Sequence, residues 1–276
     1  MERYKLLMII PALLLLASLA YIAYLATGPG FNLDIDFRGG TQVVLENSAP
    51  FSTNTIESVL ATYSPSIRTT SSLGKYSAII NLDEQTDTGE IIDALGSAGV
   101  VFTGYSIQAI GPALSSSFLS QSELALLLAF VFMAVTVFIV FRQLLPSTYV
   151  IISAFADIVE AFAASQFLGI PLSLGTFAAL LLLVGYSVDT DILLTSRVLK
   201  GEGHVKEKIH KALITGITMT GTTFAALLVL FVLSSSQIIT QMSSILLIGI
   251  VFDNFNTWIT NAGLLRWDIE RKHGEN

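Results

Sequence analysis

Long apolar runs separated by short polar breaks make up most of this chain. A helix needs about 20 apolar residues to cross the hydrocarbon core of a bilayer. Six runs are long enough, and we expect each to form a membrane-spanning helix: Leu6–Ala26, Leu124–Phe141, Tyr149–Leu168, Leu172–Val188, Leu213–Leu233 and Ile238–Leu265. The first run exceeds the apolar core of a typical signal peptide and lacks a small-residue cleavage site, which favours an uncleaved anchor.

The chain between the first two runs has the pattern of a small folded domain. β-branched and aromatic residues between turn residues predict strands, and apolar residues at helical spacing predict helices. The expected strands are Thr41–Glu46, Ile67–Thr70, Tyr76–Leu82 and Val100–Gln108, with a turn at Ser71–Gly74, and the expected helices are Asn54–Tyr63 and Asp87–Ala98. The order βαββαβ predicts a ferredoxin-like arrangement.

These patterns predict an α-helical polytopic membrane protein of six transmembrane helices with a small α+β domain. We expect residues 1–27 to form the first membrane anchor and residues 28–120 the α+β domain. Residues 121–265 would form the other five spans, and residues 266–276 a polar tail.

The composition agrees with a membrane protein and excludes several kinds of site. Of 276 residues, 53% are apolar and only 13% are charged, against about a quarter charged in soluble domains. The absence of cysteine excludes disulfides, thiol nucleophiles and cysteine-ligated metals. With three histidines we expect no metal site and no other cofactor. The net charge of −7 argues against a nucleic-acid partner.

The positions of the basic residues predict the orientation in the membrane. Only Arg38, Arg68 and Lys75 of the 14 basic residues lie between the first two spans, whereas that segment holds nine acids between Asp34 and Asp93. Six crossings place all the other basic residues on one side, which the positive-inside rule assigns to the cytoplasm. We therefore expect both termini in the cytoplasm of a cell-membrane protein and an acidic extracytoplasmic domain.

Five carboxyl groups lie inside or at the ends of the apolar runs: Asp157, Glu160, Asp189, Asp191 and Asp253. A charge at the bilayer centre costs about 2.5–3.5 kcal/mol. No Lys or Arg lies inside a run, so these groups are protonated, hydrated or paired with a partner chain. Asp157 and Glu160 share a helix face, whereas Asp189 and Asp191 cannot both point the same way. Two structural alternatives stay open: Asp191 reaches water near a helix end, and Asp253 is a hydrogen-bond node.

Two further patterns involve the fifth run. Small and hydroxyl residues beside one another favour close helix packing over a water-filled path: Thr215, Gly216, Thr218, Gly221 and Thr222. Before the run, residues 204–213 alternate lysines with apolar residues at helical spacing, which predicts an amphipathic helix at the membrane interface.

Two motifs resemble the SecD/SecF protein-export family. Asp34–Thr41 (DIDFRGGT) resembles its D-F-x-G-G motif, and Gly185–Arg197 (GYSVDTDILLTSR) resembles its fourth-helix motif in the archaeal form. The six spans and the single domain after the first span resemble the SecF branch of the family over essentially the whole chain. In the first motif, glycines permit a sharp turn before the first strand. We expect a structural role for its residues: Asp36, Phe37, Arg38, Gly39 and Gly40.

The resemblance implies one half of an RND-type transporter. Its partners would be a SecD-like subunit, the SecY translocon, translocating preproteins and the lipid bilayer, and its work would draw on the proton-motive force. It also implies a proton-coupling carboxylate in the fourth span, for which Asp189 is the first candidate and Asp191 the second. Asp157 or Asp253 would be its partner, and Glu160 is a further candidate for proton coupling. The bacterial Asn-Asp-Thr order is here Asp189-Thr190-Asp191, and no basic residue lies in the fifth run near Gly216.

Two other functions compete with protein export. A half-size RND-like exporter of lipids or small hydrophobic molecules would have the same span count. An intramembrane aspartyl protease would use two membrane aspartates, but the chain lacks the Gly-x-Gly-Asp sequence of such enzymes. We therefore expect a protein that is not an enzyme.

Overall fold

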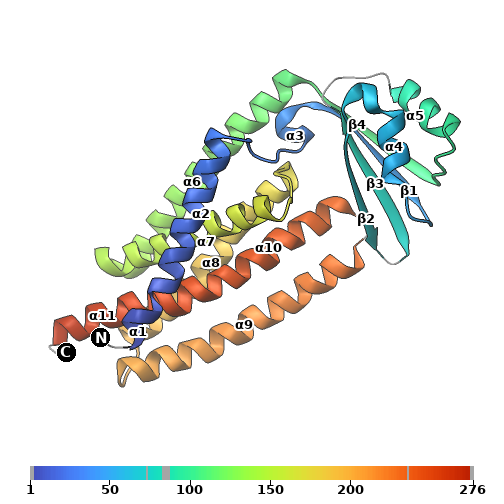
Figure 1. Ribbon diagram of the computed structural model, residues 1–276. Helices are drawn as coiled ribbons and strands as arrows, with labels where there is room; N and C mark the ends of the chain where they lie inside the picture. The colour runs from blue at the N-terminus through green and yellow to red at the C-terminus, as the bar shows by residue number, and fades with distance from the viewer. Residues whose placement is uncertain (1–2, 73, 83–87, 235, 274–276) are drawn as a thin grey trace.

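The computed structural model of the chain describes residues 3–72, 74–82, 88–234 and 236–273. A bundle of long helices and a four-stranded sheet lie end to end, and both chain ends lie at the end of the bundle away from the sheet (Figure 1). Four predicted segments lie partly outside the described residues. These are the anchor at residues 1–2, the Ser71–Gly74 turn at Leu73, the Asp87–Ala98 helix at Asp87 and the tail at residues 274–276.

Within the described part of the chain, six helical spans are long and apolar enough to cross a membrane, as the hydropathy predicted. The first consists of α1 (Arg3–Leu7) and α2 (Ile9–Thr27). The next four are α6 (Pro112–Phe141), α7 (Leu144–Phe167), α8 (Leu174–Lys200) and α9 (Val205–Leu233). The last consists of α10 (Gln237–Phe255), a π-helical segment η2 (Asn256–Asn261) and α11 (Ala262–His273). The protein is a multi-pass membrane protein.

Several helices extend beyond the predicted apolar runs. The helix α6 begins at Pro112 and not at Leu124, because proline suits the first helical turn and the polar residues after it continue the helix. The amphipathic helix predicted at residues 204–213 is helical from Val205, and it continues without a break into the apolar part of α9. Hydropathy marks the apolar part of a helix and not its polar ends.

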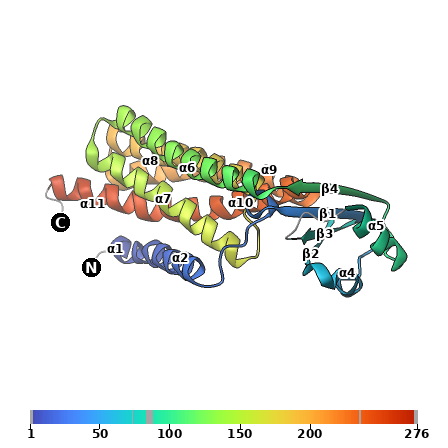
Figure 2. The ribbon, with the colours of Figure 1, turned by 90° about the horizontal axis from the view of Figure 1, so that it is seen from above.

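The middle of the bundle is formed by α7, α8 and α10, which contact one another along their length. Their core includes Val150 of α7, Leu183 of α8 and Ile245 of α10, each at most 1% exposed. At Gly249 of α10 an added Cβ would lie 2.2 Å from Leu183 Cδ2, so glycine allows this close approach. In contrast, α2 and α9 bury little of their surface in the chain and lie at the edges of the bundle (Figures 1 and 2).

The sheet domain has the predicted ferredoxin-like order. Its elements are β1 (Gly40–Asn47), α4 (Thr53–Val59), a 3-10 turn η1 (Ala61–Tyr63), β2 (Ser66–Ser72), β3 (Lys75–Leu82), α5 (Thr88–Ser97) and β4 (Gly104–Ile110). The strands pair antiparallel in the order β2-β3-β1-β4, with Val43 of β1 opposite Ile80 and Ile107. A core of aliphatic side chains lies between the sheet and the two helices, including Leu45, Ile56 and Leu95.

The last strand starts later than predicted. The strand β4 begins at Gly104 and not at Val100, because Val100 still donates its N–H to Leu95 O of α5 at 3.0 Å. Thr103 then donates its N–H to Glu46 O at 2.7 Å and leads the chain into the sheet. The apolar residues that suggested an earlier strand start close the end of the helix.

Candidate functional site

A buried group of polar side chains lies between the three central helices α7, α8 and α10. We call it the carboxyl cluster. Each of its nine side chains is at most 1% exposed. The four acids are Asp157 and Glu160 of α7, Asp191 of α8 and Asp253 of α10, and the neutral members are Ser187, Thr190, Asn256, Thr257 and Asn261. The cluster therefore unites four of the five acids that the sequence analysis selected.

One half of the cluster joins Asp157 to Glu160. The hydroxyl of Ser187 donates to Asp157 Oδ2. Asn256 Nδ2 lies 2.8 Å from both Asp157 Oδ1 and Glu160 Oε2, so one amide group connects the two carboxyls. Asp157 and Glu160 lie three residues apart on one helix face, as predicted.

The other half joins Asp191 to Asp253 through hydroxyl and amide groups. Thr190 Oγ1 lies 3.2 Å from both carboxyl oxygens of Asp253. Thr257 Oγ1 lies 3.0 Å from Asp191 Oδ1 and 3.2 Å from Asp253 Oδ1, so its single hydroxyl proton can be donated to either acid. Asn261 Nδ2 donates to Asp191 Oδ1 at 2.7 Å. Neutral donors therefore bridge acids on two different helices.

The π-helical segment brings the amide side chains to the cluster. In a regular α-helix, Asn256 and Asn261 would point about 140° apart at about 100° per residue. The wider turn of η2 places both side chains on the acids. Single π-helical turns inside α-helices often occur at functional sites.

The charge balance of the cluster requires protons or a cation. The stretches 143–196 and 212–265 contain no Lys, Arg or His. Four ionised carboxylates buried between these helices would repel one another, and a single charge at a bilayer centre already costs about 2.5–3.5 kcal/mol. Glu160 Oε1 is buried without a hydrogen bond among the described residues, so no neighbouring donor competes with a proton on that oxygen. The arrangement suits reversible protonation.

The two aspartates of the fourth-helix motif lie on opposite sides of α8. Asp191 is fully buried in the cluster, and Asp189 is exposed on the outer face. The alternative that Asp191 reaches water near a helix end is wrong, because α8 continues to Lys200 and Asp191 is packed between helices. Asp253 is a hydrogen-bond node, as one alternative held, and it is also one of the four acids.

The small-residue stripe of α9 packs against the rest of the chain at few points. Thr215, Thr218 and Thr222 donate their hydroxyls to carbonyls of their own helix. An added Cβ at Gly216 would lie 2.1 Å from the Trp258 ring, whereas one at Gly221 would have no neighbour within 4 Å. Close helix packing, predicted for the whole stripe, occurs at Gly216 and is wrong for Gly221.

The D-F-x-G-G motif lies against the start of α8. Its first residues form the one-turn helix α3 (Ile35–Arg38), and Asp36 Oδ2 accepts the N–H of Leu174 at 2.8 Å. The ring of Phe37 packs edge-on against Phe177, with ring centroids 6.3 Å apart. Burial raises the pKa of the Asp36 carboxyl above its ordinary value, although the Leu174 N–H favours the charged form. The motif thus contacts the same helix that contains Asp191.

The two glycines of the motif occupy backbone conformations that suit glycine. Gly39 has a φ of +80° and Gly40 a φ of +117°, which side chains with a Cβ rarely adopt. A Cβ at Gly39 would also lie 3.3 Å from Ile110 O and from Ser115 Oγ. Arg38 lies between Phe37 and Gly39 with an exposed side chain.

A second link joins the sheet domain to the loop between α7 and α8. Leu33 and Leu172 form an isolated parallel bridge, in which Asp34 N donates to Leu172 O and Leu172 N to Asn32 O, both at 2.8 Å. Asn32 N also donates to Gln166 Oε1 at 2.7 Å. The base of the domain is therefore hydrogen-bonded to the connection between the two helices that contain Asp157, Glu160 and Asp191.

Sequence reasoning did not select the neutral members of the cluster. Ser187 precedes Asp191 by four residues and therefore shares its helix face. Thr257 and Asn261 follow Asp253 at steps of four residues, a spacing that could have identified them. No such spacing identifies Asn256, because its orientation depends on the π-helical turn.

Comparison with known proteins identifies the family. Residues 91–271 match the family model described as "Protein export membrane protein SecD/SecF, C-terminal". The chain is 40% identical to the protein-export membrane protein SecF of Methanolacinia petrolearia, over 95% of this chain and 93% of that protein. It is 35% identical to SecF of Methanocaldococcus jannaschii, over 96% of each chain.

A solved structure shows the same fold. The crystal structure of SecDF, a translocon-associated membrane protein from Thermus, matches 96% of this chain with a TM-score of 0.81 and 19% identity. The chain spans only 38% of that longer protein. On the family model and the archaeal relatives together, the chain belongs to the SecD/SecF family of protein-export membrane proteins.

Proposed function

We propose that this protein is an accessory subunit of the Sec protein translocase. It would assist export together with a SecD-like subunit at the SecY translocon, acting on preproteins as they leave the channel. The family membership and the names of the archaeal relatives support this role. The match to little more than a third of the SecDF chain supports a partner that supplies the rest.

In this proposal the protein spans the cell membrane with both termini in the cytoplasm. Residues 28–120 would then be extracytoplasmic. The basic residues support this orientation, because eleven of the 14 lie outside that segment and six crossings place them on the side of the termini. An exported domain next to the channel exit is in a position to meet an emerging polypeptide.

The carboxyl cluster would couple the proton-motive force to this work, and it is the observation that supports the mechanism best. Asp191, Asp157 and Asp253 would form its centre, with Glu160 joined through Asn256. A proton entering the cluster would change whether Thr257 donates its hydroxyl to Asp191 or to Asp253. Among the two motif aspartates, burial favours Asp191 over Asp189 as the coupling group.

The contacts at the start of α8 would transmit this change to the exported domain. Asp191 and Leu174 belong to one helix, and Leu174 donates its N–H to Asp36 at the base of the domain. A shift of α8 along its axis would therefore act on the motif turn. The Leu33–Leu172 bridge adds a second connection beside it.

Reconstituted export tests the proposed function. Proteoliposomes containing the translocon and the SecD-like partner, with and without this chain, would import a preprotein under a proton gradient. We expect the gradient to stimulate the yield only when the chain is present, and an ionophore to abolish that stimulation. Equal stimulation without the chain would contradict the proposal.

The two competing functions predict different results in the same vesicles. The relatives are named as protein-export proteins, which does not favour the lipid-exporter alternative. A lipid exporter would release lipid under a gradient without a translocon. A protease would cleave a membrane-spanning substrate in a manner that Asp191→Asn abolishes. We propose that neither activity occurs.

A further inference from the structure

A cavity of about 280 Å³ lies between helices at the end of the bundle that is away from the sheet (Figure 1). It is separate from the carboxyl cluster. Its walls come from α1, the first turns of α9, the π-helical segment η2 and α11. The residues that matter for its chemistry are Tyr4, Lys206, His210, Leu213, Ile259 and Arg266.

The wall from α9 and the wall from the last span both change from polar to apolar toward the interior of the bundle. On α9, Lys206 and His210 precede Leu213. Leu213 lies about 10 Å beyond Lys206 along the helix, at about 1.5 Å per residue. The last span runs in the opposite sense, so Ile259 lies deeper in the bundle than Arg266. The cavity therefore has a basic mouth at the end of the bundle and an apolar interior toward the membrane.

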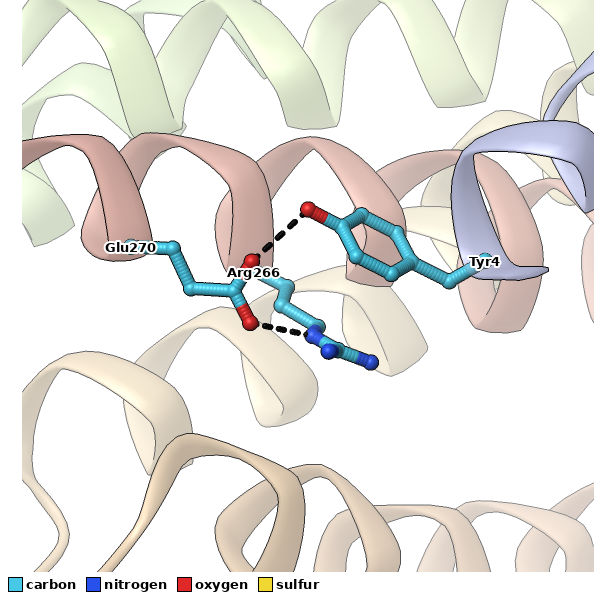
Figure 3. Close-up of polar contacts among 3 residues, drawn as sticks. All are labelled: Tyr4, Arg266 and Glu270. Carbon is cyan, nitrogen blue, oxygen red and sulfur yellow. Dashed lines mark hydrogen bonds and ion pairs between the residues drawn. The ribbon is translucent and has the colours of Figure 1, made fainter. Parts of the chain in front are cut away.

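The basic mouth is held in place by neighbouring side chains. Arg266 Nε donates to Glu270 Oε1 at 2.6 Å, and its guanidinium lies 3.9 Å from the centre of the Tyr4 ring (Figure 3). Tyr4 donates its hydroxyl to the other oxygen of Glu270 at 2.8 Å. No Asp or Glu is among the described residues that line the cavity. Glu270 offsets the charge of Arg266 from beside the wall, so Lys206 supplies the net positive charge of the lining.

A phospholipid complements these walls, because its polar headgroup fits the basic mouth and its apolar chains fit the apolar interior. Its phosphate is anionic and lies at the membrane surface, and its acyl chains extend inward. Basic pockets between transmembrane helices commonly bind anionic headgroups. One wall of the cavity belongs to α9, a span that buries little of its surface within the chain.

We propose that this cavity binds one anionic phospholipid of the adjoining leaflet. The phosphate lies against Lys206, His210 and Arg266, and an acyl chain lies against Leu213 and Ile259. The bound lipid holds the start of α9 against α1 and α11. This inference does not depend on the proposed function in export.

Tryptophan fluorescence gives a direct test, because Trp258 lines the cavity. Trp267→Phe leaves Trp258 as the single tryptophan. In nanodiscs, brominated phosphatidylglycerol should quench Trp258 at lower mole fractions than brominated phosphatidylcholine. Lys206→Gln with His210→Gln should weaken this preference at least about fivefold, the factor for one cation near an anionic surface. The matched control is Lys211→Gln, since Lys211 pairs with Glu207 on the same helix and does not line the cavity.

Each other outcome overturns the proposal. Equal quenching by the two lipids would exclude a headgroup site, and a preference that survives the double substitution would locate it elsewhere. Loss of preference in Lys211→Gln would indicate general surface charge. Displacement of brominated phosphatidylglycerol by millimolar inorganic phosphate in micelles would indicate a site for soluble anions.

Discussion

Asp189 and Asp191 differ in their surroundings although they are two residues apart on α8. At about 100° per residue their side chains leave the helix about 200° apart. One is therefore exposed and the other is buried among Thr257 and Asn261. The sequence predicts that the two differ, but which one faces inward depends on the packing of α7 and α10 around α8.

Asp36 lies outside the apolar spans, and its titration is expected to affect the stability of the fold. Its pKa is raised by burial from the ordinary value of 3.8. A raised pKa means that the folded state binds the proton more tightly, so the free energy of unfolding falls as pH rises from the ordinary value through the raised one. Asp36→Asn removes this titration and keeps an oxygen for the Leu174 N–H. As pH rises over that range, we expect the melting temperature of the wild type to fall relative to that of Asp36→Asn.

Thermal unfolding in detergent over about pH 4 to about pH 7 measures this difference. Asp36→Ala serves as the comparison, because it also removes the acceptor at the start of α8 and should cost about 1 kcal/mol at every pH. A difference between wild type and Asp36→Asn that stays constant with pH, or that grows as pH rises, would contradict the argument.

At the scale of elements, α9 contacts its neighbours at a few close points. Gly216 faces the Trp258 ring, and Gly221 on the same helix faces open space. We expect Gly216→Ala to destabilise the protein by about 1–3 kcal/mol, because the added methyl displaces the ring. Gly221→Ala should be neutral or stabilising by up to about 1 kcal/mol, because alanine favours the helix.

Melting temperatures of the two variants, measured in the same detergent, check this prediction. Each substitution adds one methyl group to the same helix, so propensity and hydrophobicity are matched. Equal melting temperatures would show that α9 does not pack on η2 as described.

The elements could be predicted from sequence to different degrees. Hydropathy predicts six spans because bilayer thickness sets a minimum apolar length. It does not locate helix ends such as Pro112 or Val205, because polar residues outside the hydrocarbon remain helical. The π-helical turn at Asn256–Asn261 has no local signal, since hydrogen bonds to acids on other helices stabilise it.

On the scale of the whole molecule, the sheet domain and the bundle meet at the α7–α8 loop. The Leu33–Leu172 bridge and the Asn32–Gln166 hydrogen bond join the two parts. These contacts come from residues over 130 positions apart in sequence, so hydropathy and motif spacing could not predict them. Because these hydrogen bonds join the loop to the base of the domain, we expect the two to move together.

A cross-link between the loop and the base of the domain tests whether the two stay together. It can be introduced cleanly, because the chain contains no natural cysteine. Leu33→Cys with Leu172→Cys should form a disulfide readily, since bridge partners lie within the distance that a disulfide spans. We expect the oxidised protein to keep its gradient-stimulated export, with each single cysteine variant as a control. If oxidation abolishes the stimulation and reduction restores it, the domain must separate from the loop during the cycle.

We propose the buried carboxyl cluster as the proton-coupling site of the whole molecule. The most direct measurement is gradient-stimulated export in proteoliposomes with Asp191→Asn, Asp157→Asn and the matched surface variant Asp189→Asn. Asparagine keeps the size of aspartate but cannot exchange a proton. We predict that the Asp191 and Asp157 variants fall to the level of ionophore-treated wild type, while Asp189→Asn keeps the stimulation. Normal stimulation in both buried variants, or its loss in Asp189→Asn alone, would contradict the account.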